Sequence, residues 1–298
     1  AVVLHYGQTV FEGLKAYRQP DGGVALFRPE RNAARMAKSC QRLALPEFPE
    51  DAFVEACELL VRQDAAWVPA GEGASLYLRP FVWATEVGLG VRPSASALFQ
   101  LIASPSGNYC SGPLRPVTLW LSQEYTRAAP GGTGAAKCGG NYAASLVAQQ
   151  EAIAAGCDQV VFLDAVERRW LEELGGMNIF LVLDDGTLVT PEVSGTTLEG
   201  ITRDSIITLA RELGHTVEER KVDVDEWRKG AADGSVVEVF ACGTAAVITP
   251  IGALRWPGGE AVAGTGEPGA ITMKLRKALM DVQYGRAADT HGWMRKVV

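Results

Sequence analysis

Short apolar stretches typical of strands alternate irregularly with helical stretches along the 298 residues of the chain. Because no regular strand–helix–strand cadence connects them, a doubly wound parallel sheet is disfavoured. A passage rich in proline, glycine and serine over residues 104–116 separates the two halves, as a linker would. We therefore predict two α+β domains, over residues 1–109 and 117–298, joined by a linker at 110–116.

The spacing of apolar residues predicts the secondary structure elements. The best-defined helix has apolar side chains at intervals of three and four and ends before Pro69. In the helix predicted over 143–155, we expect Leu146, Val147 and Ile153 on the buried side. The predicted helices cover residues 32–43, 49–68, 143–155, 202–213 and 271–284, and the predicted strands cover 24–27, 75–80, 97–103, 117–121, 159–163, 177–183 and 236–242.

Composition and charge exclude several classes of protein. The net charge of −7 disfavours nucleic-acid binding, because an acidic surface repels phosphates. No apolar run approaches the roughly 18 residues that a membrane-spanning helix needs. The six cysteines form no C-x-x-C pair and the three histidines lie far apart, so we expect reduced thiols, a cytoplasmic location and no metal site. Because the sequence opens at Ala1 in what resembles the middle of a domain, we also expect an N-terminal segment to be missing from it.

A single lysine, Lys137, lies in the glycine-rich stretch GGTGAAKCGGNY at residues 131–142. A phosphate-binding P-loop needs glycine directly before the lysine and a hydroxyl after it, whereas this chain has Ala136 and Cys138 there. A lysine that attacks a carbonyl must be partly unprotonated, and burial favours that state. From this stretch alone, an ordinary solvated lysine remains the simpler interpretation.

Three further segments contain residues that could complete a site. The stretch WLEELGGMN places Glu172 and Glu173 before a Gly-Gly turn and an apolar strand. Because neighbours on a strand point to opposite faces, we expect Glu172 to be solvated. The stretch LEGITRDS opens a helix at Gly200 with hydroxyls nearby, which suits either a bound anion or a plain N-cap. The stretch CGTAAVITP ends a strand in a turn of small residues whose amides could face a ligand.

Together with the lysine stretch, these segments resemble the branched-chain amino acid aminotransferases, enzymes of fold type IV that use pyridoxal phosphate (PLP). The resemblance covers almost the whole chain and is carried by LHYGQTVFEGLKAY, FRPERNAARM, SLYLRPF, KCGGNYAASL, EELGGMN, LEGITRDS, GTAAVITPIG and VQYGRAADTHGWM. Their order and spacing match throughout, which is far more specific than any single motif. The resemblance implies a smaller N-terminal α/β domain, a larger C-terminal pseudo-barrel domain and a homodimer.

The resemblance also implies which residues bind the cofactor. Lys137 would form the Schiff base with PLP and would then act as general base. Tyr142 would hydrogen-bond the phenolic oxygen, and Glu173 would lie beside the pyridine nitrogen and keep it protonated. The phosphate would be bound by Arg35, Ile201, Thr202 and Thr244.

The implied reaction moves the amino group of L-leucine, L-isoleucine or L-valine to 2-oxoglutarate, giving branched 2-oxo acids and L-glutamate. The residues implied in substrate binding are Tyr6, Phe11 and Tyr77 in an apolar pocket, and the backbone amides of Ala245 and Ala246 near the substrate carboxylate, with Arg79 in a supporting role. A D-amino acid aminotransferase or an aminodeoxychorismate lyase of the same fold shares the lysine and the carboxylate, so both remain alternatives. A non-catalytic PLP-binding protein is an alternative of another class.

Overall fold

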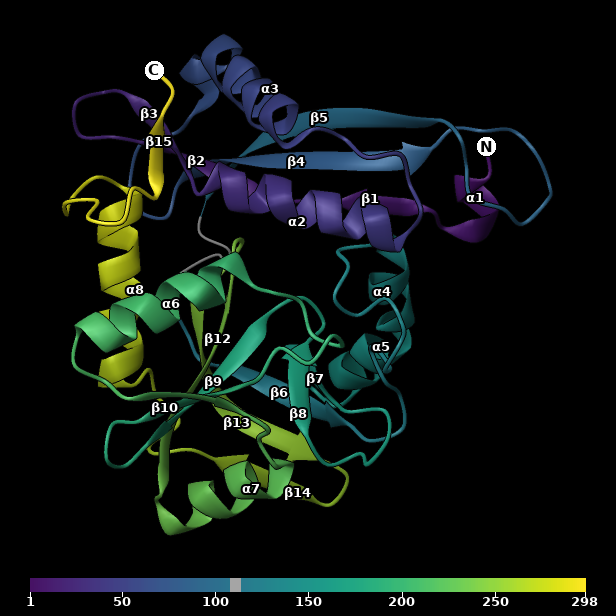
Figure 1. Cartoon of the computed structure of the whole chain (residues 1–298). Helices are drawn as coiled ribbons and strands as arrows, with labels where there is room; N and C mark the ends of the chain where they lie inside the picture. The colour runs from purple at the N-terminus through teal and green to yellow at the C-terminus, as the bar shows by residue number, and fades with distance from the viewer. Residues whose placement is uncertain (108–113) are drawn as a thin grey trace. The chain divides into compact units, whose positions relative to one another are not determined.

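The computed structural model of the chain describes residues 1–107 and 114–298, so the predicted linker at 110–116 lies largely outside the described residues. Two compact units make up the chain (Figure 1). The first comprises Ala1–Gly112, Ala136–Gly140 and Met280–Val298, and the second comprises Pro113–Ala135 and Asn141–Leu279. The chain therefore passes between the units several times, which a division by position along the sequence does not anticipate. Lys137 belongs to the first unit and Tyr142 to the second.

The first unit contains an antiparallel sheet, to which the described residues contribute six strands. They are β1 (Thr9–Phe11), β2 (Leu14–Arg18), β3 (Val24–Phe27), β4 (Ser75–Ala84), β5 (Ala97–Ser106) and β15 (Met294–Lys296). Both β1 and β2 pair with one edge of β4, and β5 pairs with the other along its whole length. At the far side β15 pairs with β3, so the end of the chain shares a sheet with its beginning.

The strand β5 extends into the proline-rich passage at residues 104–116, which we predicted to separate the two domains. Ser104, Pro105 and Ser106 pair with residues of β4. Because β5 pairs with β4 alone among the described strands, it lies at a sheet edge, where a proline without an N–H is tolerated. The first residues of the proline-rich passage therefore belong to the sheet.

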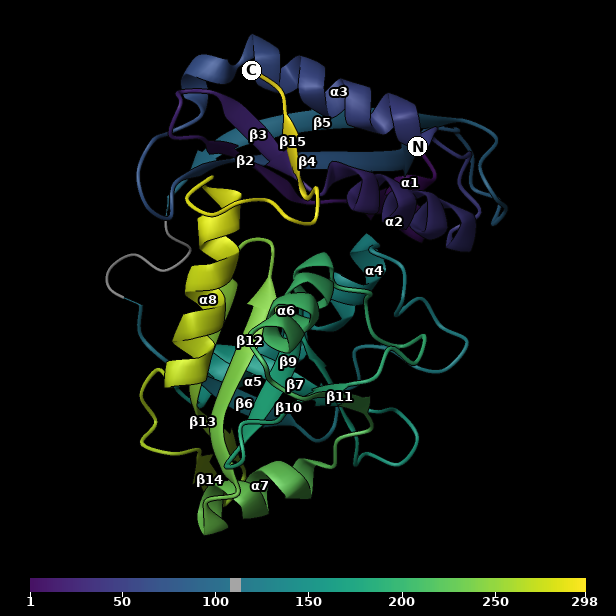
Figure 2. The ribbon, with the colours of Figure 1, turned by 60° about the vertical axis from the view of Figure 1, so that its left-hand side comes forward.

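Two long helices, α2 (Pro29–Arg42) and α3 (Glu50–Gln63), pack against each other and against this sheet (Figures 1 and 2). The first begins three residues before its predicted start, because Pro29 suits the first helical position, where no N–H is needed. Their buried faces carry apolar side chains at helical spacing, namely Ala33, Met36, Cys40, Phe53, Cys57 and Val61. The short helices α1 (Val3–Tyr6) and η1 (Ala65–Trp67) complete the helices described before β4.

The second unit contains a mixed sheet of nine described strands in the order β11-β10-β9-β12-β13-β6-β7-β8, with β14 beside β13. Its last strand, β8, returns to contact β9, so the sheet curls into a half-open barrel. The strands are β6 (Val117–Ser122), β7 (Gln159–Leu163), β8 (Leu171–Leu174), β9 (Asn178–Leu183), β10 (Leu188–Pro191), β11 (Val217–Arg220), β12 (Val236–Gly243), β13 (Val247–Trp256) and β14 (Gly259–Val262). The predicted α+β fold with a pseudo-barrel is confirmed.

The remaining helices are α4 (Gly139–Ala144), α5 (Leu146–Ala154), α6 (Ile201–Glu212), α7 (Val224–Asp233) and α8 (Ala270–Gln283). Among them, α6 contacts β12, and α7 contacts both β12 and β14 (Figure 2). No helix within residues 1–107 and 114–298 is both long and apolar enough to cross a bilayer.

The helix predicted over 143–155 differs from the observed one in two ways. It is split at Ser145, whose hydroxyl donates to the C=O of Tyr142 at 2.7 Å. The expected buried face is wrong, because Leu146, Val147 and Ile153 are 65%, 50% and 66% exposed. The buried side chains of α5 are two alanines at positions 148 and 152, which pack in a small cluster with residues of β7. Their small size allows the helix to approach the strand closely.

Candidate active site

Within the first unit, the backbone of Lys137 is held on both sides. Its N–H donates to the Oγ of Ser39 and its C=O accepts the N–H of Phe11, both at 3.0 Å. Ser39 in turn donates to the C=O of Arg35 in α2 at 2.9 Å. The Lys137 Nζ lies 4.8 Å from the centroid of the Phe11 ring, whose face attracts a cation. The lysine is partly buried, and the strand β1 and the helix α2 together fix its position.

Three of the predicted substrate-binding residues form one cluster in the same unit. The guanidinium carbon of Arg79 lies 4.8 Å from the centroid of the Phe11 ring and 5.2 Å from that of Tyr77. Its Nη2 donates to the Tyr77 hydroxyl at 2.8 Å. A Cβ atom at Gly13 would lie 2.0 Å from that hydroxyl, so only glycine leaves room for it. The cluster combines aromatic ring faces with a cation whose position is fixed. Tyr6 lies at the end of α1, where its hydroxyl donates to the C=O of Leu89.

The predicted phosphate ligand Arg35 makes a buried ion pair with Glu12. Its Nε donates to Glu12 Oε1 at 2.7 Å and its Nη2 to Oε2 at 2.8 Å. The amide of Asn32 donates to the same carboxylate at 2.7 Å. Burial alone would raise the pKa of Glu12, but attraction by Arg35 and Lys137 and the hydrogen bonds lower it below the usual value. Glu12 is therefore ionised and fixes the orientation of the guanidinium.

Replacing Glu12 by glutamine should lower the free energy of unfolding by about 3 kcal/mol, because it leaves the buried guanidinium of Arg35 without a counter-charge. Denaturant unfolding of the cofactor-loaded enzyme measures this change. Glu30→Gln is the matched control on the same unit, since Glu30 is 57% exposed where it pairs with Arg295. That control should change stability by less than about 1 kcal/mol. Equal stability of the two variants would contradict the structural role of Glu12.

In the second unit, Glu173 is a buried carboxylate within β8. It forms an ion pair with Arg127, and the two side chains are 3% and 4% exposed. Its Oε1 also accepts the backbone N–H of Leu198 at 2.9 Å. Arg127 further donates to the C=O of Gly134 at 3.1 Å and to that of Thr196. The ion pair and the hydrogen bonds offset the cost of burying this carboxylate.

The residue Tyr142 lies beside the glycine turn that follows Glu173. A Cβ atom at Gly176 would be 3.4 Å from the Cε1 atom of Tyr142 and 3.9 Å from its hydroxyl oxygen. Next to this turn lies the connection between β12 and β13, since a Cβ atom at Gly243 would approach Met177 to 3.3 Å. The sequence motifs around Tyr142, Glu173 and Gly243 therefore meet at one end of the curled sheet.

The helix α6 begins at Ile201 and Thr202 with features of an anion site. Its N-cap residue, Gly200, makes no side-chain cap hydrogen bond. A Cβ atom at Gly200 would lie 1.9 Å from Asn178 Oδ1, so glycine allows the helix start to approach β9. The N-terminal amides, the helix dipole and the Thr202 hydroxyl form a donor set that fits a phosphate. The arrangement favours the anion-site interpretation over a side-chain N-cap.

The connection from β12 to β13 contains Thr244, Ala245 and Ala246. It ends at Val247, which has a φ of +61°. A β-branched residue in this left-handed region is strained, and such strain concentrates where backbone groups are held for a ligand. The turn therefore holds its amides in a defined orientation.

One residue beside the site departs from its prediction. Glu172 was expected to be solvated, but it is 6% exposed, because β8 is covered on both faces.

Four residues that hold the predicted site were not identified from the sequence, namely Glu12, Ser39, Asn178 and Arg127. Glu12 and Asn178 lie inside quoted motifs, and Ser39 and Arg127 lie three and four residues from one, but each role depends on a partner from a distant segment.

Comparison with known proteins agrees with this geometry. The family model for amino-transferase class IV matches residues 9–254. The branched-chain-amino-acid aminotransferase of Mycolicibacterium smegmatis is 60% identical over all of this chain and 82% of its own length. That of Mycobacterium tuberculosis is 58% identical, with the same coverage.

Solved structures agree as well. The branched-chain amino acid aminotransferase of Escherichia coli has a TM-score of 0.86 and 33% identity, and the match covers 99% of this chain and 92% of that one. The enzyme of Thermobaculum terrenum, solved in its PLP form, has a TM-score of 0.83 and 30% identity, with coverage of 100% and 92%. Fold and site thus define a class IV aminotransferase, a PLP-dependent transaminase. Within that class, the chain belongs to the branched-chain-amino-acid aminotransferase family.

Proposed function

We propose that the chain transfers the amino group of L-leucine, L-isoleucine and L-valine to 2-oxoglutarate, with Lys137 as its catalytic residue. The observation that carries this proposal is the position of Lys137. Its backbone is fixed by Ser39 and Phe11, and its amine lies over the ring of Phe11. Bound PLP supplies an electron-accepting ring that stabilises negative charge at the substrate Cα.

The residues of this chain would bind the cofactor at four points. Lys137 would hold it covalently, and Glu173 would keep its ring nitrogen protonated, since Arg127 and the N–H of Leu198 hold that carboxylate in place. Tyr142 would hydrogen-bond the phenolic oxygen. The phosphate would be bound by Arg35, Thr244 and the start of α6 at Ile201 and Thr202.

Proton transfer and substrate orientation are assigned to separate groups. The Nζ of Lys137 would act as the general base that takes and holds the proton lost from the substrate Cα. The carboxylate of the substrate would be oriented by Arg79 and by the backbone amides of Ala245 and Ala246. The aromatic rings of Tyr6, Phe11 and Tyr77 would exclude water around the branched side chain.

Amino donor specificity tests this proposal against the other fold-type IV activities. We expect kcat/KM for L-leucine to exceed that for D-alanine by more than about a hundredfold, because the aromatic cluster favours a large apolar side chain. L-leucine, L-isoleucine and L-valine should differ by only about 10–200-fold, since one methylene in an apolar pocket contributes little. Consumption of 2-oxoglutarate measures both, because it does not depend on which enantiomer of glutamate is formed. Preference for D-alanine would indicate a D-amino acid aminotransferase, and turnover of aminodeoxychorismate alone would indicate the lyase.

We further propose that the enzyme is a cytoplasmic homodimer. The exposed aliphatic side chains Leu146, Val147 and Ile153 on α5 support an apolar contact with a second copy. The five cysteines of the described residues are free and buried, which suits a reducing compartment. Sedimentation velocity of the cofactor-loaded enzyme tests the dimer, and a single species of monomer mass would contradict it.

A further inference from the structure

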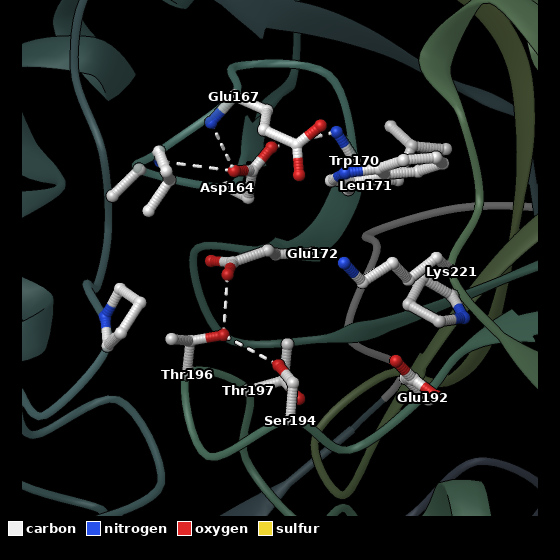
Figure 3. Close-up of a pocket in the computed structure, with 14 residues that line it drawn as sticks. Asp164, Glu167, Trp170, Leu171, Glu172, Glu192, Ser194, Thr196, Thr197 and Lys221 are labelled. Atoms are coloured by element: carbon white, nitrogen blue, oxygen red, sulfur yellow. Dashed lines mark hydrogen bonds between the residues drawn. The ribbon is translucent and has the colours of Figure 1, made fainter.

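A pocket of about 250 Å³ lies in the second unit on the side of β8 that carries Glu172 (Figure 3). It is lined by the loop that follows β7, by the segment after β10 and by β8 itself. Because one water occupies roughly 30 Å³ of liquid, the pocket has room for about eight waters or one small organic molecule. None of the residues assigned above to cofactor or substrate lines it.

The carboxylate of Glu172 lies in the wall of this pocket with one oxygen unused. Figure 3 shows it between Asp164 and Thr196, and its Oε1 accepts the hydroxyl of Thr196 at 2.5 Å. Its Oε2 is buried and has no hydrogen-bond partner among the described residues. Glu172 is 6% exposed, so this oxygen has lost bulk water without gaining a donor from the part of the chain that the structure describes. A buried acceptor of this kind costs free energy unless a ligand or an ordered water satisfies it.

A second polar atom in the pocket wall has a similar environment. Thr197 is 3% exposed, and its hydroxyl oxygen is also buried without a partner in residues 1–107 and 114–298. Asp164 is not available to a ligand in this way, because its carboxylate accepts the N–H groups of Val166, Glu167, Arg169 and Trp170 at 2.7–3.0 Å. Glu172 and Thr197 are therefore buried groups that offer acceptors to an occupant.

The charges around the pocket favour a cationic occupant. Its lining includes the carboxylates of Asp164, Glu167, Glu172 and Glu192, against the single basic side chain of Lys221. The Nζ of Lys221 lies 5.2 Å from the centroid of the Trp170 ring, where the indole face attracts it. The rest of the lining is largely apolar and includes Pro130, Val166, Leu171 and Pro191.

We propose that this pocket is a second binding site, which takes a small organic ammonium ion whose N–H donates to Glu172 Oε2 and whose apolar body packs against the wall formed by Val166 and Pro191. The site is separate from the residues of the proposed transamination. The strand β8 carries both carboxylates, with Glu173 assigned to the cofactor and Glu172 to this second ligand.

Calorimetric titration of the cofactor-loaded enzyme with N,N-dimethylpropylammonium tests the proposal. This probe is a tertiary ammonium ion, so it carries one N–H donor but cannot condense with an aldehyde. We expect saturable binding at one site per chain. Glu172→Gln should weaken it by about tenfold or more, because a charged acceptor is replaced by a neutral one. Glu192→Gln, which removes an exposed carboxylate of the same pocket, should weaken it by less than about threefold.

Val166→Trp is a second variant. It leaves the buried core unchanged, because Val166 is 73% exposed. The larger side chain should obstruct the pocket and also weaken binding by about tenfold or more. If Glu172→Gln fails to fold, as its melting curve would show, the Val166 variant decides alone. Isopentyl alcohol, a neutral ligand of similar size, should bind at least about tenfold more weakly than the probe. The proposal is overturned if the wild-type enzyme shows no saturable binding, or if a folded Glu172 or Val166 variant binds the probe as tightly as wild type. Transamination rates are measured separately, so either outcome leaves the test of the proposed function unaffected.

Discussion

Lys137→Ala should lower kcat for transamination of L-leucine by about a thousandfold or more. Alanine can neither hold the cofactor covalently nor take the proton from Cα, so two roles are lost in one change. The measurement is L-glutamate formation under saturating substrates. The absorption band that borohydride bleaches in the wild-type enzyme should be absent from the variant.

Lys229→Ala is the matched control, because Lys229 is 78% exposed and its ion pair with Asp225 is long, at 4.0 Å. It should keep kcat within about twofold of wild type, as expected for a weak surface pair. Should Lys137→Ala turn over L-leucine at the wild-type rate, the assignment of Lys137 would be wrong. An inactive wild-type enzyme that still binds the cofactor would favour the non-catalytic alternative.

Glu173→Gln should lower kcat by about 10²–10³-fold, the usual effect of removing one preorganised charge from an active site. The neutral amide cannot keep the ring nitrogen of the cofactor protonated, so negative charge at Cα is less well stabilised. The substitution also leaves the buried Arg127 without its counter-charge, which destabilises the second unit. The rate is therefore expressed per mole of bound cofactor, and unfolding is monitored in parallel.

The control for this experiment is Glu260→Gln, in the same unit, because Glu260 is 43% exposed where it pairs with Arg255. Its rate per bound cofactor should match that of wild type. A Glu173 variant with the same rate as this control would remove Glu173 from the proposed mechanism, whatever its effect on stability.

Elements with a clear local pattern were predictable. The strands predicted at 24–27 and 117–121 differ from β3 and β6 by at most one residue, and the helix predicted at 202–213 differs from α6 by one residue at each end. Runs of β-branched and apolar residues, or apolar residues at helical spacing, define such elements without help from the rest of the chain.

Other elements had no such pattern. The strand β13 was missed because Pro250 and Gly252 interrupt its apolar residues. The strand β8 was not predicted because two carboxylates, Glu172 and Glu173, lie at its centre. Their burial is stabilised by a hydrogen bond from Thr196 and an ion pair with Arg127. The exposed aliphatic face of α5 was assigned to the core, because hydrophobicity by itself does not say which side of a helix meets a strand.

The sequence by itself determined the family and the residues of the predicted site, because the motifs around Lys137, Glu173 and Gly200 are contiguous and keep their order. Tertiary structure decided which groups those residues meet. Glu12 reaches Arg35 across 23 positions, and Arg127 reaches Glu173 across 46. Only the register of the strands and the packing of the helices bring such distant charges within hydrogen-bonding distance. The pocket beside Glu172 also exists only because β8, the loop after β7 and the segment after β10 meet in the folded unit.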